Sequence, residues 1–176
     1  SKVARLGALT YERAISSMPI AGCYRAIDFA ISNMTNAGVT KIGVITQYSS
    51  SSLLNHLSTP KVWNLGEKKG GLFVFTPSMV RGNLMWHRGT ADSMYQNIDF
   101  LKKSQEPYVI VSPGNIINKI DYKEMLKQHE ETGADITILA KRFDDTEELT
   151  RLGVIEVNDK NVVTNFEEKP LEPASN

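Results

Sequence analysis

Short runs of β-branched and aromatic residues alternate with amphipathic segments along this chain of 176 residues. In residues 24–37 the apolar side chains Ile27, Ile31 and Met34 recur at helical spacing, and Gly38 follows as a natural helix terminator. Similar patterns predict further helices over residues 49–57, 90–103 and 121–132. Continuous β-forming runs predict strands over residues 41–46, 71–76, 108–112 and 135–140, and a hairpin of residues 153–157 with 161–166.

The order of these elements determines the expected architecture. Strands that alternate with helices through short links are typical of a mainly parallel sheet with helices on both faces. We therefore predict a three-layer α/β fold of Rossmann-like type, with the hairpin at the margin of the sheet. A chain of this length fits one domain with a sizeable core.

Composition narrows the classes of function. The 20 basic and 20 acidic side chains cancel, so no net field attracts nucleic acid or an anionic membrane. Cys23 is the only cysteine, which excludes an internal disulfide and a multi-cysteine zinc site. No apolar run approaches the ~20 residues that a bilayer span needs. We expect a cytoplasmic protein that binds neither nucleic acid nor membranes.

Candidate binding residues lie at the carboxyl ends of predicted strands, where ligands bind in an open α/β sheet. Asn115 takes this position after the run 108–112 and a Pro113-Gly114 break. Arg13 and Arg25 flank an early loop. An arginine in such a loop either clamps phosphate with its planar set of donors or is simply solvated.

A second candidate is the run Arg88-Gly89-Thr90-Ala91-Asp92, which opens the helix predicted over residues 90–103. Gly89 permits close approach of the backbone to a ligand. Thr90 is suited to cap the helix, and the amino terminus of a helix attracts anions. This pattern is a weak signal for a phosphate site when it is taken alone.

Asp28 and His56 have simpler interpretations. Asp28 follows Arg25 by one helical turn, a spacing that predicts an ion pair between the two side chains. His56 lies on a predicted helix and is expected at the surface.

These segments, taken in order along nearly the whole chain, resemble the glucose-1-phosphate adenylyltransferases, also called ADP-glucose pyrophosphorylases. The matching segments are residues 5–10, 24–29, 32–33, 43–48, 88–92, 96–97, 114, 121–122, 153–154, 166 and 168–170. The resemblance implies a nucleotide pocket formed by Arg5, Arg88, Gly89, Thr90, Ala91, Asp92 and Gly114. It implies sugar-phosphate binding by Gly153, Glu168 and Lys169, and it makes Arg13, Arg25 and Gln47 loop or phosphate candidates.

Three positions depart from the family pattern, all on the side of the triphosphate and the metal ion. Val3 stands where the family's phosphate loop has a glycine, and its branched Cβ resists the required backbone angles. Ile15 stands where the family has a phosphate-contacting lysine, and it offers no donor. Asn115 replaces the aspartate that holds Mg²⁺ in the family, and a neutral amide is a poor ligand for this ion.

The retained and lost residues together resemble the non-catalytic GlgD-type subunit of this family. That resemblance implies a regulatory subunit of ADP-glucose and glycogen synthesis, with impaired catalysis of its own, in a hetero-oligomer with a catalytic homologue. Its expected ligands are glucose 1-phosphate and ATP or ADP-glucose, and no cofactor, Mg²⁺ included, is expected to bind tightly. Residues 1–176 are expected to be a fragment, with the end of the nucleotidyltransferase-like domain and a downstream β-helix domain outside it.

Two alternatives remain open. One is a competent transferase that makes ADP-glucose and pyrophosphate from ATP and glucose 1-phosphate, with another residue compensating for Asn115. The other is a stand-alone sensor that binds a sugar phosphate without turnover. Assays of the full-length chain, alone and with a catalytic subunit, separate the three.

Overall fold

The computed structural model describes residues 6–58, 63, 65, 70–77, 79–80, 83–84, 86–142 and 149–172. The chain divides into two compact units, Ser1–Gln128 and His129–Asn176, and each is considered by itself. The helices of the first unit are η2 (Gly7–Thr10), η3 (Ile15–Ser17), α1 (Ala26–Asn36), α2 (Ser51–Leu57), α3 (Thr90–Gln96) and α4 (Ile98–Ser104). Its strands are β1 (Pro19–Ile20), β2 (Tyr24–Arg25), β3 (Lys41–Ile45), β4 (Gly71–Phe75), β5 (Met79–Val80) and β6 (Asn83–Leu84). Helix α5 (Tyr122–Thr132) crosses the boundary between the units, and β7 (Gly153–Val157) and β8 (Val163–Glu168) belong to the second.

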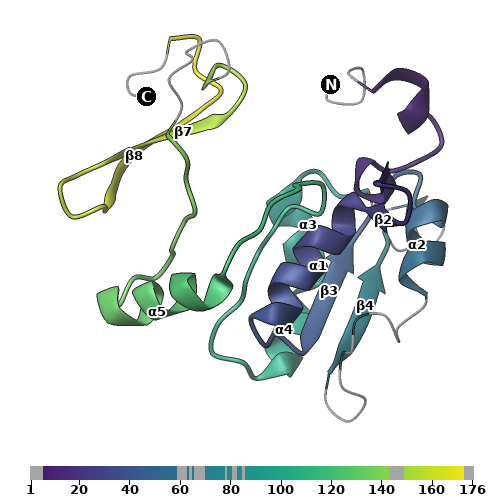
Figure 1. The fold of residues 1–176 in the computed structure, drawn as a ribbon, viewed down its shortest axis with the longest axis horizontal. Coiled ribbons are helices and arrows are strands. Elements are labelled where there is room, and N and C mark those ends of the chain that lie inside the picture. Colours follow the sequence, from purple (N-terminus) through teal and green to yellow (C-terminus); the bar gives the residue numbers. More distant parts are fainter. Residues whose placement is uncertain are drawn as a thin grey trace. The chain divides into compact units, whose positions relative to one another are not determined.

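A parallel pair of strands, β3 with β4, lies at the centre of the first unit (Figure 1). One face of this pair carries Ile42 and Val44, which pack in a buried cluster with side chains of α1 and α2. The members from the helices are Ile27, Ile31, Leu53 and Leu57. Trp63 joins the same cluster, and Leu72 and Val74 of β4 pack against it.

The opposite face of the pair is covered by α4. The ring of Phe100 lies 5.3 Å from that of Phe73 and 5.1 Å from that of Phe75, measured between centroids. A Cβ at Gly43 would lie 2.9 Å from Phe100, so this glycine lets the ring rest directly on the strand. Helices therefore cover both faces of a parallel pair, and the predicted α/β fold is confirmed.

The predicted end of the first helix is also confirmed. Gly38 follows α1 with a φ of 92°, a left-handed conformation that favours glycine. Its N–H donates to the carbonyl of Thr35 (3.0 Å), and the N–H of Val39 donates to that of Met34 (3.0 Å). These two bonds form a Schellman motif, which satisfies carbonyls at the end of the helix.

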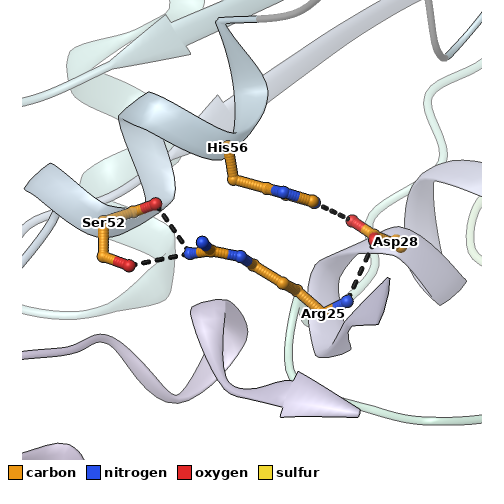
Figure 2. Close-up of polar contacts among 4 residues, drawn as sticks. All are labelled: Arg25, Asp28, Ser52 and His56. Carbon is orange, nitrogen blue, oxygen red and sulfur yellow. Dashed lines mark hydrogen bonds and ion pairs between the residues drawn. The ribbon is translucent and has the colours of Figure 1, made fainter. Parts of the chain in front are cut away.

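The amino-terminal turn of α1 is fastened to α2 by polar contacts (Figure 2). A carboxylate oxygen of Asp28 accepts the backbone N–H of Arg25 (2.9 Å), and the other contacts Nε2 of His56 at 2.6 Å. The guanidinium of Arg25 instead donates to the carbonyl (2.8 Å) and hydroxyl (2.7 Å) oxygens of Ser52. The predicted Arg25–Asp28 ion pair is therefore wrong, because each side chain reaches to α2.

The surface position expected for His56 is wrong as well. Its side chain is only 20% exposed because the ring lies between Asp28 and Trp63. The ring meets the indole of Trp63 edge-on, with centroids 6.3 Å apart.

Three predicted elements differ from the structure. The helix expected over residues 90–103 is divided at Asn97 into α3 and α4. The side-chain amide of Asn97 donates back to the carbonyl of Ser93 (2.8 Å), which competes with the regular helix at this point. Residues 108–112 and 135–140 form no strand in the structure. A strand needs a hydrogen-bonded neighbour, and neither run is paired in a sheet. In the first run, the side chains of Val109 and Val111 are 52% and 58% exposed rather than buried as in a central strand.

The predicted hairpin is confirmed in the second unit, where β7 and β8 pair antiparallel. Its second strand begins at Val163, two residues later than expected. The side-chain oxygen of Asn158 fixes the turn by accepting the backbone N–H groups of Lys160 and Val162, both at 3.0 Å.

The Asp28 contacts generate a stability prediction. Replacement Asp28→Asn removes the charge that serves both the start of α1 and His56, and we expect a loss of about 1.5 kcal/mol, the lower end of the range for hydrogen bonds to charged groups. Urea unfolding of the full-length protein measures this loss. Asp135→Asn, the same change at an exposed site, is the control and is expected to shift stability by less than about 0.5 kcal/mol. Equal effects of the two replacements would contradict the assignment.

Candidate functional site

A cavity of about 400 Å³ in the first unit brings several predicted site residues together. The cavity runs beside β3 and α1. One part of its wall is apolar, and the other part, which we call the rim, is more polar. The apolar part includes Ile27, Ala30, Ile31, Met34, Ile42, Val44 and Leu53. The rim includes Arg13, Ile15, Tyr48, Ser49, Ser112, Gly114 and Asn115.

Ile15 is held beside the loop that follows β3. The N–H of Ala14 donates to the carbonyl of Ser49 (3.3 Å), and both the N–H and the hydroxyl of Ser17 donate to the carbonyl of Ala14 (2.9 Å each). Ser17 is fully buried, so the short helix η3 is anchored at this point. The structure thus places Ile15 at the carboxyl end of a parallel strand, as a ligand-contacting residue of an α/β sheet requires.

Asn115 reaches the same rim because Gly114 packs tightly on α1. A Cβ at Gly114 would lie 2.6 Å from Cδ1 of Ile27 and 3.7 Å from Cβ of Ser16, so a larger residue would displace the turn. Further along, the amide of Asn33 donates to the backbone and side-chain oxygens of Asn118 (3.1 and 3.3 Å). These contacts fix the loop against α1 and leave Asn115 exposed at its tip.

The donor set of the cavity does not suit a divalent cation. Among the described residues that line it, Arg13 is the only charged side chain, and none is a carboxylate. Magnesium prefers oxygen ligands that include carboxylates. More widely, no three His, Cys, Asp or Glu side chains in the described part of the chain cluster as metal ligands.

Gln47 joins the loop after β3 to the segment before α3. Its side-chain oxygen accepts the N–H of His87 (2.8 Å), and its side-chain nitrogen donates to the carbonyl of His87 (3.5 Å). Beside it, the rings of Tyr48 and Trp86 stack with centroids 4.9 Å apart and planes inclined by 13°. This aromatic pair was not predicted from the sequence. The one signal for it is that an aromatic residue, Tyr48, directly follows the polar residues at the end of β3.

The run from Arg88 to Asp92 opens α3, but Thr90 does not cap it as predicted. Gly89 is the residue before the helix, and Asp92 accepts the N–H of Arg88 (2.8 Å) and the side-chain amide of Gln96 (2.9 Å). The carboxylate is better placed for this than the Thr90 hydroxyl because it reaches back over the first turn. The side chain of Arg88 is exposed, as is Ala91.

One other predicted residue lies apart from the cavity. Arg25 is bound to Ser52 and does not line the cavity, so its geometry favours a structural role over a phosphate clamp. Arg5 lies outside the described residues, as does Val3.

In the second unit, the predicted sugar-phosphate residues are neighbours. Gly153 pairs with Glu168 across the hairpin, and the N–H of Lys169 donates to the carbonyl of Leu152 (2.9 Å). Nζ of Lys169 contacts a carboxylate oxygen of Glu168. A Cβ at Gly153 would lie 2.9 Å from the ring of Phe166, so only glycine fits without a shift. One end of the hairpin therefore presents the carboxylate of Glu168, the ammonium group of Lys169 and, at Gly153, a backbone without a side chain.

No helix in the described part of the chain has the length and apolar character that a membrane crossing requires.

Comparison with known proteins gives a consistent result. Residues 2–176 match the family model described as nucleotidyl transferase. The chain is 40% identical to the glucose-1-phosphate adenylyltransferase of Clostridium novyi (strain NT) over 98% of its own length and 45% of the relative's. It is 39% identical to that of Bacillus licheniformis over 99% of its length and 46% of the relative's. It is 40% identical to that of Lachnospira eligens over 98% of its length and 40% of the relative's.

The chain thus spans less than half the length of these relatives. The resemblance to glucose-1-phosphate adenylyltransferases is confirmed at the level of sequence. By the match over nearly its whole length, the chain belongs to the nucleotidyl transferase family.

Proposed function

We propose that this chain is part of a regulatory subunit of the glucose-1-phosphate adenylyltransferase type, with impaired catalysis of its own. One observation carries the proposal: Ile15 and Asn115 line the same rim, beside a cavity that no described carboxylate lines. Two charges that the family resemblance leads us to expect, at positions far apart in the sequence, are thus absent from one place.

The chemistry of adenylyl transfer explains why these losses matter. A phosphate oxygen of glucose 1-phosphate attacks the α-phosphorus of ATP, the bond to the β-phosphate oxygen breaks, and pyrophosphate leaves. Such reactions depend on positioning and on stabilising the charge of the phosphates. Ile15 donates nothing to a phosphate, and Asn115 brings no negative charge to a metal ion. Removal of one well-placed stabilising group typically costs ~10²–10³ in rate.

The hairpin supports retention of ligand binding. Gly153, Glu168 and Lys169 lie together at one end of β7 and β8, and the last two side chains are solvent-accessible. A subunit that binds glucose 1-phosphate or ADP-glucose without turning it over is suited to modulate a catalytic partner. The hetero-oligomer with a catalytic homologue is part of this proposal.

An assay with and without a partner tests the proposal. Pyrophosphate release from ATP and glucose 1-phosphate by the full-length protein alone is expected to be at least ~100-fold below that of a catalytic homologue, since a charge stabiliser is lost. Addition of the protein to the catalytic homologue is expected to change the homologue's rate. A full rate for the protein alone would contradict impaired catalysis. Ligand binding without any effect on the homologue would favour the stand-alone sensor instead.

A rescue experiment tests the cause of the impairment. Asn115→Asp with Ile15→Lys restores one negative and one positive charge at the same rim, and we expect the double variant to gain pyrophosphate release. The two effects should be coupled because both act on the same phosphates. A triple variant adds Val3→Gly to restore the flexibility of the phosphate loop.

Asn165→Asp with Ile136→Lys makes the same chemical changes at exposed positions of the second unit and serves as the control. It should gain no activity. If the triple variant stays folded and inactive, the rim is not the cause of the impairment.

A further inference from the structure

A buried polar contact joins the first turn of α1 to the end of α2 (Figure 2). The side chain of Asp28 is only 9% exposed, so its carboxylate has lost most of its hydration. The backbone N–H of Arg25 and Nε2 of His56 take the place of that water. A buried charge that loses a hydrogen-bond partner is costly. Loss of His56 should therefore favour a wider spacing of the two helices, at which water reaches the carboxylate.

The short helix η3 lies in contact with both α1 and α2. At one end, the N–H of Ala26, the first residue of α1, donates to the carbonyl of Met18, directly after η3 (3.2 Å). At the other end, the N–H of Ala14 donates to the carbonyl of Ser49, in the loop that leads into α2 (3.3 Å). Because η3 is bonded toward a different helix at each end, its position depends on the spacing of α1 and α2.

The same two segments carry residues of the rim. Arg13 and Ile15 flank Ala14, and both line the cavity. Tyr48 directly precedes Ser49, and both of these line it as well. A change in the spacing of α1 and α2 would therefore move the rim on both sides of the bond between Ala14 and Ser49.

Apolar packing also holds the two helices together, through Ile31, Leu53 and Leu57. Such packing is non-directional. The contact between Asp28 and His56 is a hydrogen bond, which has a preferred distance and angle, and it constrains one end of α2. The two contributions are separable, because loss of the polar contact leaves the apolar cluster in place.

We propose that Asp28 and His56 are positioning residues for the rim. Their contact sets the spacing of α1 and α2, and this spacing sets where η3 and the loop before α2 place the rim residues. Neither side chain lines the cavity, so each acts on the rim only through the helices. The consequence for ligand binding rests on the proposed function, whereas the effect on the geometry of the rim does not.

Three variants of the full-length protein separate positioning from stability. His56→Leu keeps an apolar group beside Trp63 but leaves the carboxylate of Asp28 without this partner. His56→Gln is the conservative variant, because the amide nitrogen of glutamine can take the place of Nε2 and donate to Asp28. Asn55→Ala changes an exposed residue of the same helix and is the control.

Fluorine NMR of protein labelled with fluorotryptophan reads the geometry of the rim. The ring of Trp86 stacks on that of Tyr48, with centroids 4.9 Å apart, so its resonance depends on where the loop before α2 holds Tyr48. A Trp86→Phe variant assigns the resonance. We expect His56→Leu to shift the Trp86 resonance further than Asn55→Ala does, and His56→Gln to return it to the position of the unaltered protein.

A purely structural role for the contact gives a different result. If His56→Leu is folded and leaves the Trp86 resonance where Asn55→Ala has it, the proposal is overturned. A shift that His56→Gln does not reverse also overturns it. Should His56→Leu fail to fold, Asp28→Asn is added to remove the unpaired buried charge, and absence of the shift in this double variant is equally fatal. Since no arm involves ATP or turnover, the outcome is independent of the proposed function.

Discussion

The packing of apolar side chains on both faces of the β3–β4 pair is the constraint on which the rest of the first unit depends. Ile42 and Val44 bind α1 and α2 to one face, and Phe100 binds α4 to the other. Because Gly43 has no side chain, the aromatic ring can approach the strand directly. The loops that form the candidate rim line the cavity beside this strand.

The loops around the rim are positioned by contacts to the backbone rather than by charge pairs. Ser49 receives the N–H of Ala14, and Gln47 bonds to the backbone of His87. Gly114 fits against Ile27 only because it lacks a Cβ. A scaffold of this kind persists when charged residues at its edge are replaced. That explains how a family fold can be retained while Ile15 and Asn115 stand where the resemblance expects a lysine and an aspartate.

Sequence patterns predicted those elements whose determinants are local. Helix α1 follows from the spacing of Ile27 and Ile31, and its end follows from Gly38, whose φ of 92° suits glycine. The runs at 108–112 and 135–140 have β-forming sequences, yet a strand exists only when another segment supplies hydrogen bonds, and sequence pattern does not reveal that neighbour. The break at Asn97 was missed because it depends on one side-chain bond to Ser93.

The same distinction applies to the site. Gly114 and Asn115 line the cavity together with Arg13 and Ile15, although the strand expected before them does not form, and their role as site residues stays a prediction. Arg25 and Asp28 were paired with each other on spacing alone, but Ser52 and His56 provide better-placed partners from α2. Contacts between helices of this kind depend on how the helices pack, which spacing along one helix does not determine. The grouping of Gly153, Glu168 and Lys169 was expected only through the family resemblance.

The proposed function requires that the rim does not bind a metal–triphosphate complex. Isothermal titration of the full-length protein with ATP, with and without Mg²⁺, tests it most directly, and Asn115→Asp provides the matched comparison. The account predicts that Mg²⁺ leaves the affinity of the unaltered protein for ATP unchanged, because a neutral amide gives the ion little to bind. Micromolar ATP binding by the unaltered protein that requires Mg²⁺ would contradict the account.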